Sequence, residues 1–191
     1  MSLFSRSAAY MCAIMHIVAG IGAIFFLRGG SEAIYDIHQR VAYMTQFPDR
    51  WRLGWLLWML AALTLILFYG WWGSRIGKLW PVGIAAAGLA CDWSGESIFI
   101  ASIPRPDTRL YRDAALLTGA AGNGLYTVAA IILTVATRQL PWQWLAWCAW
   151  MAGVALTTAT IFNSDMGVTV ASAALMIFFV PWVVIAGKKM P

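Results

Sequence analysis

The chain has 191 residues, of which 61% are hydrophobic and 11% are charged, and its mean hydropathy is +0.72. Soluble domains are about half apolar and one-quarter charged, so this composition argues against a soluble domain and predicts an all-α integral membrane protein. The net charge of +5 comes from 13 Lys and Arg that lie almost entirely in predicted loops and tails, which argues against a nucleic-acid partner.

Six apolar runs, each about 20 residues long, predict six helices that cross a bilayer as one bundle and one domain. An amphipathic interfacial helix is expected between the first and the second. The predicted transmembrane helices lie at about 8–27, 53–72, 81–103, 114–136, 142–161 and 168–186.

The segment 31–47 differs from the runs on either side because apolar and polar residues alternate in it at helical spacing. This pattern predicts a helix that lies in the membrane interface. Ser31 is the expected N-cap, Pro48 the expected end, and Asp36 with Arg40 an expected i,i+4 ion pair.

The third run, 81–103, carries Asp92 near its midpoint and Glu96 one turn later. Because a charge at the centre of a bilayer is costly, such residues predict a functional site. The Asp92 face of this helix is otherwise mostly small, and we expect it to pack on another helix. In the fourth run, Gly119 and Asn123 lie on one stripe of the helix surface, and we expect this stripe to pack against the Asp92 face. The residues on the Asp92 face are Ala85, Gly88, Gly95 and Phe99.

Depth in the membrane can be counted at about 1.5 Å per residue from the end next to segment 31–47. His16, Asp92 and Tyr126 then fall at one level, and Glu96 and Asn123 fall about one turn nearer that surface. We therefore expect the first, third and fourth helices to meet. Their polar side chains should point at one another or into a shared water-filled cavity.

Two carboxylates in a low-dielectric site cannot both ionise cheaply, so at least one of Asp92 and Glu96 is expected to hold a proton. His16 is a side chain that could exchange it. This set suits proton-coupled binding or transport, and equally a general acid and base acting on a lipid-soluble substrate. For Asn123 and Tyr126 the favoured role is hydrogen bonding between helices.

A zinc set can be assembled from the Cys, His and acidic residues near Asp92, but no recognised ligand spacing is present, so we expect neither a metal nor a cofactor. Arg105, Arg109 and Arg112 lie in or beside a polar turn, which favours a solvated turn over recognition of a lipid headgroup or other anion. Trp93 lies beside Asp92, where it either faces lipid or forms a wall of the site.

The remaining Trp residues are predicted to form interfacial belts at the two membrane surfaces. Trp51 marks one surface. The residues predicted to mark the other surface are Trp71, Trp72, Trp80, Trp142, Trp144 and Trp182.

An even number of spans places both termini on one side of the membrane. The predicted loops and tails on that side contain Lys and Arg but no acid, which favours a cytoplasmic location in a bacterial-type inner membrane. The basic residues on that side are Arg6, Arg75, Lys78, Arg138, Lys188 and Lys189.

Three functions remain open from the sequence. The first is proton-coupled binding or transport of a small or lipid-like ligand at Asp92 and Glu96, aided by His16. The second is a non-catalytic subunit of a larger membrane complex, so the expected partners are membrane lipid and other membrane subunits or further copies of the chain. The third is a membrane-embedded enzyme that uses the two carboxylates as acid and base.

Overall fold

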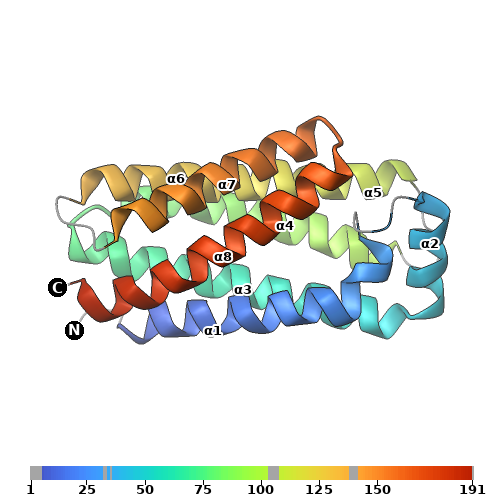
Figure 1. Ribbon diagram of the computed structural model, residues 1–191, viewed down its shortest axis with the longest axis horizontal. Helices are drawn as coiled ribbons and strands as arrows, with labels where there is room; N and C mark the ends of the chain where they lie inside the picture. The colour runs from blue at the N-terminus through green and yellow to red at the C-terminus, as the bar shows by residue number, and fades with distance from the viewer. Residues whose placement is uncertain (1–5, 32–33, 35, 103–107, 138–141, 191) are drawn as a thin grey trace.

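The computed structural model is a bundle of long helices (Figure 1) and describes residues 6–31, 34, 36–102, 108–137 and 142–190. Within these ranges the structure has no strand. The α-helices are α1 (Ser7–Gly22), α2 (Ile37–Gln46), α3 (Pro48–Arg75), α4 (Trp80–Ala101), α5 (Thr108–Ala115), α6 (Asn123–Ala136), α7 (Gln143–Ile161) and α8 (Asp165–Lys189).

Two π-helical segments extend these helices into longer rods. Segment η1 (Ala23–Leu27), followed by the 3-10 turn η2 (Arg28–Gly30), continues α1. Segment η3 (Leu116–Gly122) joins α5 to α6. The π-helix is rare and occurs often at functional sites, so its presence in two rods draws attention to that part of the bundle.

Five rods of the described chain are long and apolar enough to cross a membrane, and they indicate a membrane protein. The predicted third helix is present as α4, with 22 residues, but it is not one of the five. Asp92 and Glu96 lower its hydropathy. The five rods are Ser7–Gly30, Pro48–Arg75, Arg109–Ala136, Gln143–Ile161 and Asp165–Lys189.

Helix α2, which the sequence predicted to be interfacial, is shorter than predicted, because Asp36 rather than Ser31 is its N-cap. An Asp36 carboxylate oxygen accepts a hydrogen bond from the backbone N–H of His38 at 2.8 Å. The predicted Asp36–Arg40 ion pair is therefore wrong, and Arg40 instead binds Asp165 at 2.7 Å. Pro48 follows α2 as predicted but also begins the 28-residue α3, since proline has the φ of a first helical turn and no N–H to leave unpaired.

The rods form a closed ring, in the order α1, α3, α4, α6, α7, α8 and back to α1. Both termini lie at one end of this ring, the termini end, and α2 and α5 lie at the other, the α2 end (Figure 1). The prediction that the first, third and fourth helices meet is correct for α4 with η3 and α6. It is wrong for α1, because α3 lies between α1 and α4 in the ring.

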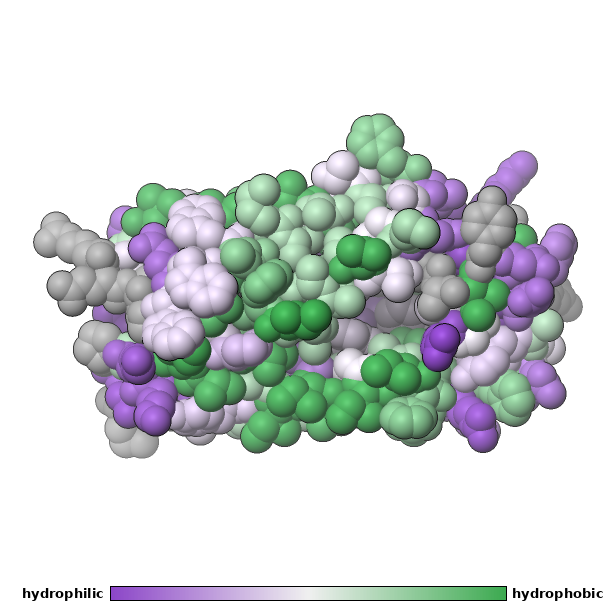
Figure 2. Space-filling view, viewed as in Figure 1, coloured by the Kyte–Doolittle hydropathy of each residue, from purple (hydrophilic) through white to green (hydrophobic). Residues whose placement is uncertain are grey.

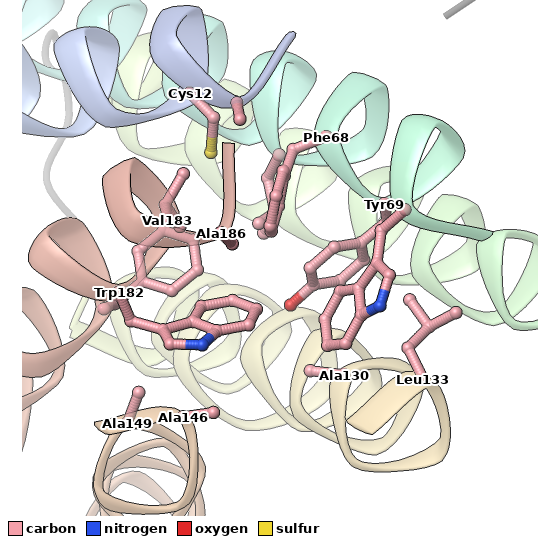
Figure 3. Close-up of a cluster of buried hydrophobic side chains, with 14 of the residues drawn as sticks. Cys12, Phe68, Tyr69, Ala130, Leu133, Ala146, Ala149, Trp182, Val183 and Ala186 are labelled. Carbon is pink, nitrogen blue, oxygen red and sulfur yellow. The ribbon is translucent and has the colours of Figure 1, made fainter. Parts of the chain in front are cut away.

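The termini end of the ring is filled by side chains from all six rods, and Figure 3 shows part of this cluster. We call its large members, Phe68, Trp71, Trp72 and Trp182, the aromatic core; none is more than 1% exposed. The Trp72 and Trp182 rings lie 5.1 Å apart between centroids, and Trp72 donates to the hydroxyl of Thr137 at 2.9 Å. Packed side chains therefore fill the interior of the ring at this end.

The predicted belt is consequently wrong for four Trp residues. Trp51, Trp71, Trp72 and Trp182 are 0–1% exposed and pack inside the bundle. Residues of the belt that do face outward are Trp80, Trp142 and Trp144, at 61%, 49% and 57% exposure.

Candidate functional site

The half of the ring nearer the α2 end encloses a partly open cavity of about 1890 Å³. Pockets for drug-sized ligands typically have volumes of about 300–1,000 Å³, so this cavity has room for a larger molecule. All six rods of the ring contribute to its wall. Tyr69, Trp150 and Phe179 line it next to the aromatic core and close it towards the termini end.

Five of the predicted site residues line this one cavity. Asp92 and Glu96 come from α4, Asn123 and Tyr126 from α6, and His16 from α1. The expectation of a shared cavity therefore agrees with the geometry, although α1 and α4 do not adjoin. Trp93, in contrast, is not part of the lining, since its indole N–H donates to the Met59 carbonyl of α3 at 3.1 Å.

The Asp92 face of α4 packs closely against η3 and α6, as its small residues predicted. Ala85, Gly88, Gly95 and Phe99 of this face are all buried. A Cβ added to Gly95 would lie 2.6 Å from the Ala114 carbonyl oxygen, and one added to Gly122 would lie 3.0 Å from the Asp92 Cβ. The absence of a side chain at these glycines permits this approach, which sets Asp92 directly against Gly122 of η3.

Asp92 is held by Tyr126, whose hydroxyl donates to a carboxylate oxygen at 3.1 Å. The backbone carbonyl of Tyr126 in turn accepts a hydrogen bond from the Tyr69 hydroxyl at 3.3 Å. These bonds link α3, α6 and α4 at one depth. They place Asp92 and Tyr126 at a common level, which agrees with the count from the helix ends.

Glu96 is the more deeply buried acid, at 2% exposure. Its Oε2 receives no hydrogen bond from any residue of the described ranges. The indole N–H of Trp55, also on the cavity wall, is likewise buried and without an acceptor among those residues. Because most buried polar atoms in proteins have a partner, these two atoms require an explanation.

His16 makes its contacts with its own helix and with aromatic rings. Its Nδ1 lies 2.8 Å from the Cys12 carbonyl oxygen, and its ring lies 5.0 Å from that of Phe179 and 6.3 Å from that of Trp58, centroid to centroid. With Nδ1–H donating to that carbonyl, Nε2 carries the lone pair of a neutral imidazole. In the part of the chain that the structure describes, His16 forms no hydrogen bond or ion pair with either acid.

Asn123 and Gly119 face α7 rather than α4, which corrects the predicted stripe. The Asn123 amide donates to the Gly153 carbonyl at 2.7 Å and to the Thr157 hydroxyl at 2.9 Å. A Cβ on Gly119 would meet the Thr160 hydroxyl at 2.6 Å. These contacts match the interhelical role favoured for Asn123, whereas Tyr126 bonds to a site residue.

The three Arg residues of the predicted turn have different environments. Arg112 lines the cavity and donates to the carbonyls of Thr160 and Ile161, at 2.7 and 2.8 Å, so it caps the end of α7. Arg109 is exposed. Arg105 lies outside the described residues.

The cavity opens sideways between α1 and α8. Ile21 and Ile24 of α1 and η1 are 52% and 62% exposed, and Met166 and Val170 of α8 are 79% and 62% exposed, yet all four line the cavity. Figure 2 shows this opening as a hollow on the face where the two helices diverge towards the α2 end. We call this opening the side portal.

Sequence reasoning missed several residues of the cavity. Trp55, Trp58 and Trp150 line it, and the Arg40–Asp165 ion pair ties α2 to the start of α8 at its α2 end. Trp55 and Trp58 lie one turn apart near the start of the predicted helix at 53–72, where the sequence does not distinguish an interfacial Trp from one that faces a cavity. No sequence pattern pairs Arg40 with a residue so distant in the chain.

Within the described ranges no three His, Cys, Asp or Glu residues are grouped as a metal site would require. No protein-family model matches the sequence, and no curated protein or solved structure matches it either.

Proposed function

We propose that the chain is an integral membrane protein that binds a small or lipid-like ligand in its cavity, with proton coupling through Asp92 and Glu96. The observation that carries the proposal is the lining. Polar residues from three rods, including both acids, meet in one cavity that also has aromatic walls. Ligand sites commonly combine such apolar walls with a few convergent polar groups.

Access through the side portal favours a ligand that arrives from the bilayer. The portal is flanked by exposed aliphatic side chains of α1 and α8, which are the groups that face lipid chains in a membrane. For this arrangement α4 must cross the bilayer with the five more apolar rods. Its acids are tolerated because they face the inside of the ring, as intramembrane acids usually do.

The aromatic core closes the cavity towards the termini end. In this conformation the site is accessible from the portal and not from the end where the termini lie, which is the geometry of a ligand-loaded or ligand-accepting state. Movement of the ligand across the membrane would require the aromatic core to open. Binding is therefore the step that the geometry supports best.

Proton coupling follows from the two acids on one wall of an apolar cavity. Two negative charges a helical turn apart repel strongly where the dielectric constant is low. A ligand that enters and replaces water around them changes the cost of each charge, so its binding must take up or release protons.

The orientation that we propose has both termini in the cytoplasm, because Lys and Arg without acids occupy the described segments at that end.

The test uses the double variant Asp92→Asn with Glu96→Gln in the full chain, reconstituted in lipid vesicles. A brominated long-chain alcohol serves as the probe, and quenching of tryptophan fluorescence reports its binding across a pH series. Wild type should bind with an affinity that changes with pH, and the double variant with an affinity that does not.

The control is Asp49→Asn with Asp113→Asn, which removes the same charge from two exposed positions away from the cavity. It should retain the pH dependence of wild type. Thermal stability and oligomeric state are measured on all three proteins. The proposal is refuted if wild type shows no saturable quenching, or if the double variant keeps the full pH dependence.

A further inference from the structure

Two residues of the cavity wall, Glu96 and Trp55, each have a buried polar atom with no partner in the described chain, and these atoms indicate the chemistry of the ligand. The Oε2 of Glu96 and the indole Nε1 of Trp55 are both buried, and neither has a hydrogen-bond partner among the described residues. Leaving such groups unpaired is costly, so a molecule that pairs with both is favoured in the cavity.

Phe99 places the two groups on one stretch of wall. The Trp55 indole stacks on the Phe99 ring, with centroids 4.5 Å apart and an interplanar angle of 15°. Phe99 follows Glu96 by three residues, so the two side chains are neighbours on the α4 surface. The backbone of Phe99 is itself fixed by Trp51, whose N–H donates to its carbonyl at 3.0 Å.

The donors and acceptors of these two groups restrict the ligand. The indole nitrogen of Trp55 only donates, and the Glu96 carboxylate, when ionised, only accepts. A hydroxyl accepts one hydrogen bond and donates another at a single oxygen. An ammonium group cannot accept, an ether cannot donate, and a carboxylate cannot donate and is repelled by the acids.

The positive charges of the cavity do not favour an anionic headgroup. Three Arg residues belong to the lining. Arg40 is bound to Asp165, Arg112 is bound to the end of α7, and Arg28 is exposed. Besides Asp92, whose carboxylate is held by Tyr126, the lining includes apolar and aromatic side chains such as Leu27, Trp58 and Phe99.

We propose that the cavity selects neutral lipophiles with a free hydroxyl group, such as long-chain alcohols, acylglycerols or sterols, and that this hydroxyl accepts from Trp55 and donates to Glu96. The selection rests on the proposed binding function, and it names the class of ligand for the same site. The apolar body of the ligand then extends towards the side portal.

The test compares three brominated probes that share one alkyl chain: the alcohol, its methyl ether and the primary amine. Binding to the full chain in lipid vesicles is read from tryptophan quenching, for which Trp58 and Trp150 on the cavity wall serve as reporters. Wild type should bind the alcohol about tenfold more tightly than the ether, because the ether leaves Glu96 unpaired.

The preference for alcohol over ether should disappear in Glu96→Leu, which leaves no acceptor for the hydroxyl proton. Trp55→Phe keeps a stacking ring but removes an N–H that the alcohol and the ether both accept, so it should weaken binding of both probes and leave the preference in place. Glu96→Gln introduces an amide N–H that can donate to the ether oxygen, so the preference should shrink in this variant. Trp71→Phe is the matched control, because Trp71 also has a buried N–H without a partner in the described chain but lies in the aromatic core, away from the cavity. If Glu96→Leu does not fold, the loss of preference in Glu96→Gln decides the test.

Equal affinity of wild type for alcohol and ether would overturn the selection of hydroxyl groups while leaving the binding function intact. Tighter binding of the amine, lost in Glu96→Gln, would show an ammonium site and would also overturn it. Absence of saturable quenching by all three probes would instead refute the proposed function.

Discussion

Replacing Gly95 with alanine should loosen the contact between α4 and η3 on which the position of Asp92 depends. The added Cβ would lie 2.6 Å from the Ala114 carbonyl oxygen, 2.7 Å from the Thr118 methyl and 3.0 Å from the Leu117 Cβ. A backbone carbonyl cannot rotate away as a flexible side chain can, so the two rods must separate. Gly83, on the same helix, has no atom within 4 Å of an added Cβ and is the matched control.

The expected difference in stability between Gly95→Ala and Gly83→Ala follows from the terms that the two variants have in common. Both gain the higher helix propensity of alanine, about 1 kcal/mol in soluble helices, so this gain cancels in the comparison. Gly95→Ala alone adds the strain of overpacking, which typically costs about 1–3 kcal/mol. We therefore expect Gly95→Ala to be less stable than Gly83→Ala by about that amount, and to weaken ligand binding because the Asp92–Tyr126 hydrogen bond is stretched.

The assay is unfolding of the purified variants in mixed detergent micelles, followed by circular dichroism, with probe binding measured in parallel. Gly83→Ala should match or exceed the stability of wild type and bind the probe normally. Equal stability of the two variants would show that α4 and η3 do not approach closely, and the account of how Asp92 is positioned would then be wrong.

Three further changes test individual contacts. Asn123→Ala removes both hydrogen bonds to α7 and should cost about 1 kcal/mol of stability, the usual range within membranes, without abolishing probe binding in the quenching assay. Arg112→Gln uncovers the last carbonyls of α7 and should lower stability by about 1 kcal/mol in detergent unfolding; no loss would show that the cap is dispensable. A double-mutant cycle of Arg40→Gln and Asp165→Asn should give a coupling of about 1 kcal/mol, and a value of zero would contradict the tie between α2 and α8.

The positions of the rods could be predicted from the sequence, because the length of an apolar run and the cost of a charge within it are both properties of a single helix. Asp92 and Glu96 stood out for that reason. The small face of α4 was also predictable, since close helix packing requires small side chains. Counting the rise per residue placed Asp92 and Tyr126 at one depth, and the structure joins them by a hydrogen bond.

The order of rods around the ring was not predictable, because it depends on contacts between segments far apart in the chain. This is why α1 was expected beside α4, when α3 separates them. The stripe of Gly119 and Asn123 failed for a related reason: in a small-residue helix several faces fit a neighbour equally well, and here Gly122 and Tyr126 took the place beside α4. Buried Trp residues were mistaken for belt residues because hydropathy does not distinguish a lipid-facing from an inward-facing indole.

The measurement that tests the central claim most directly is native mass spectrometry of the chain extracted in mild detergent, with wild type compared against two variants of α8. Ser172 lines the cavity, so Ser172→Trp places an indole inside it and takes space from a ligand; Ala174 lies two residues away outside the lining, so Ala174→Trp does not. Wild type and Ala174→Trp should each retain one lipophilic molecule, and Ser172→Trp should retain it in a clearly smaller fraction of the protein. Retention by Ser172→Trp equal to that of wild type, or no retention by any of the three, would contradict a ligand cavity at this place in the fold.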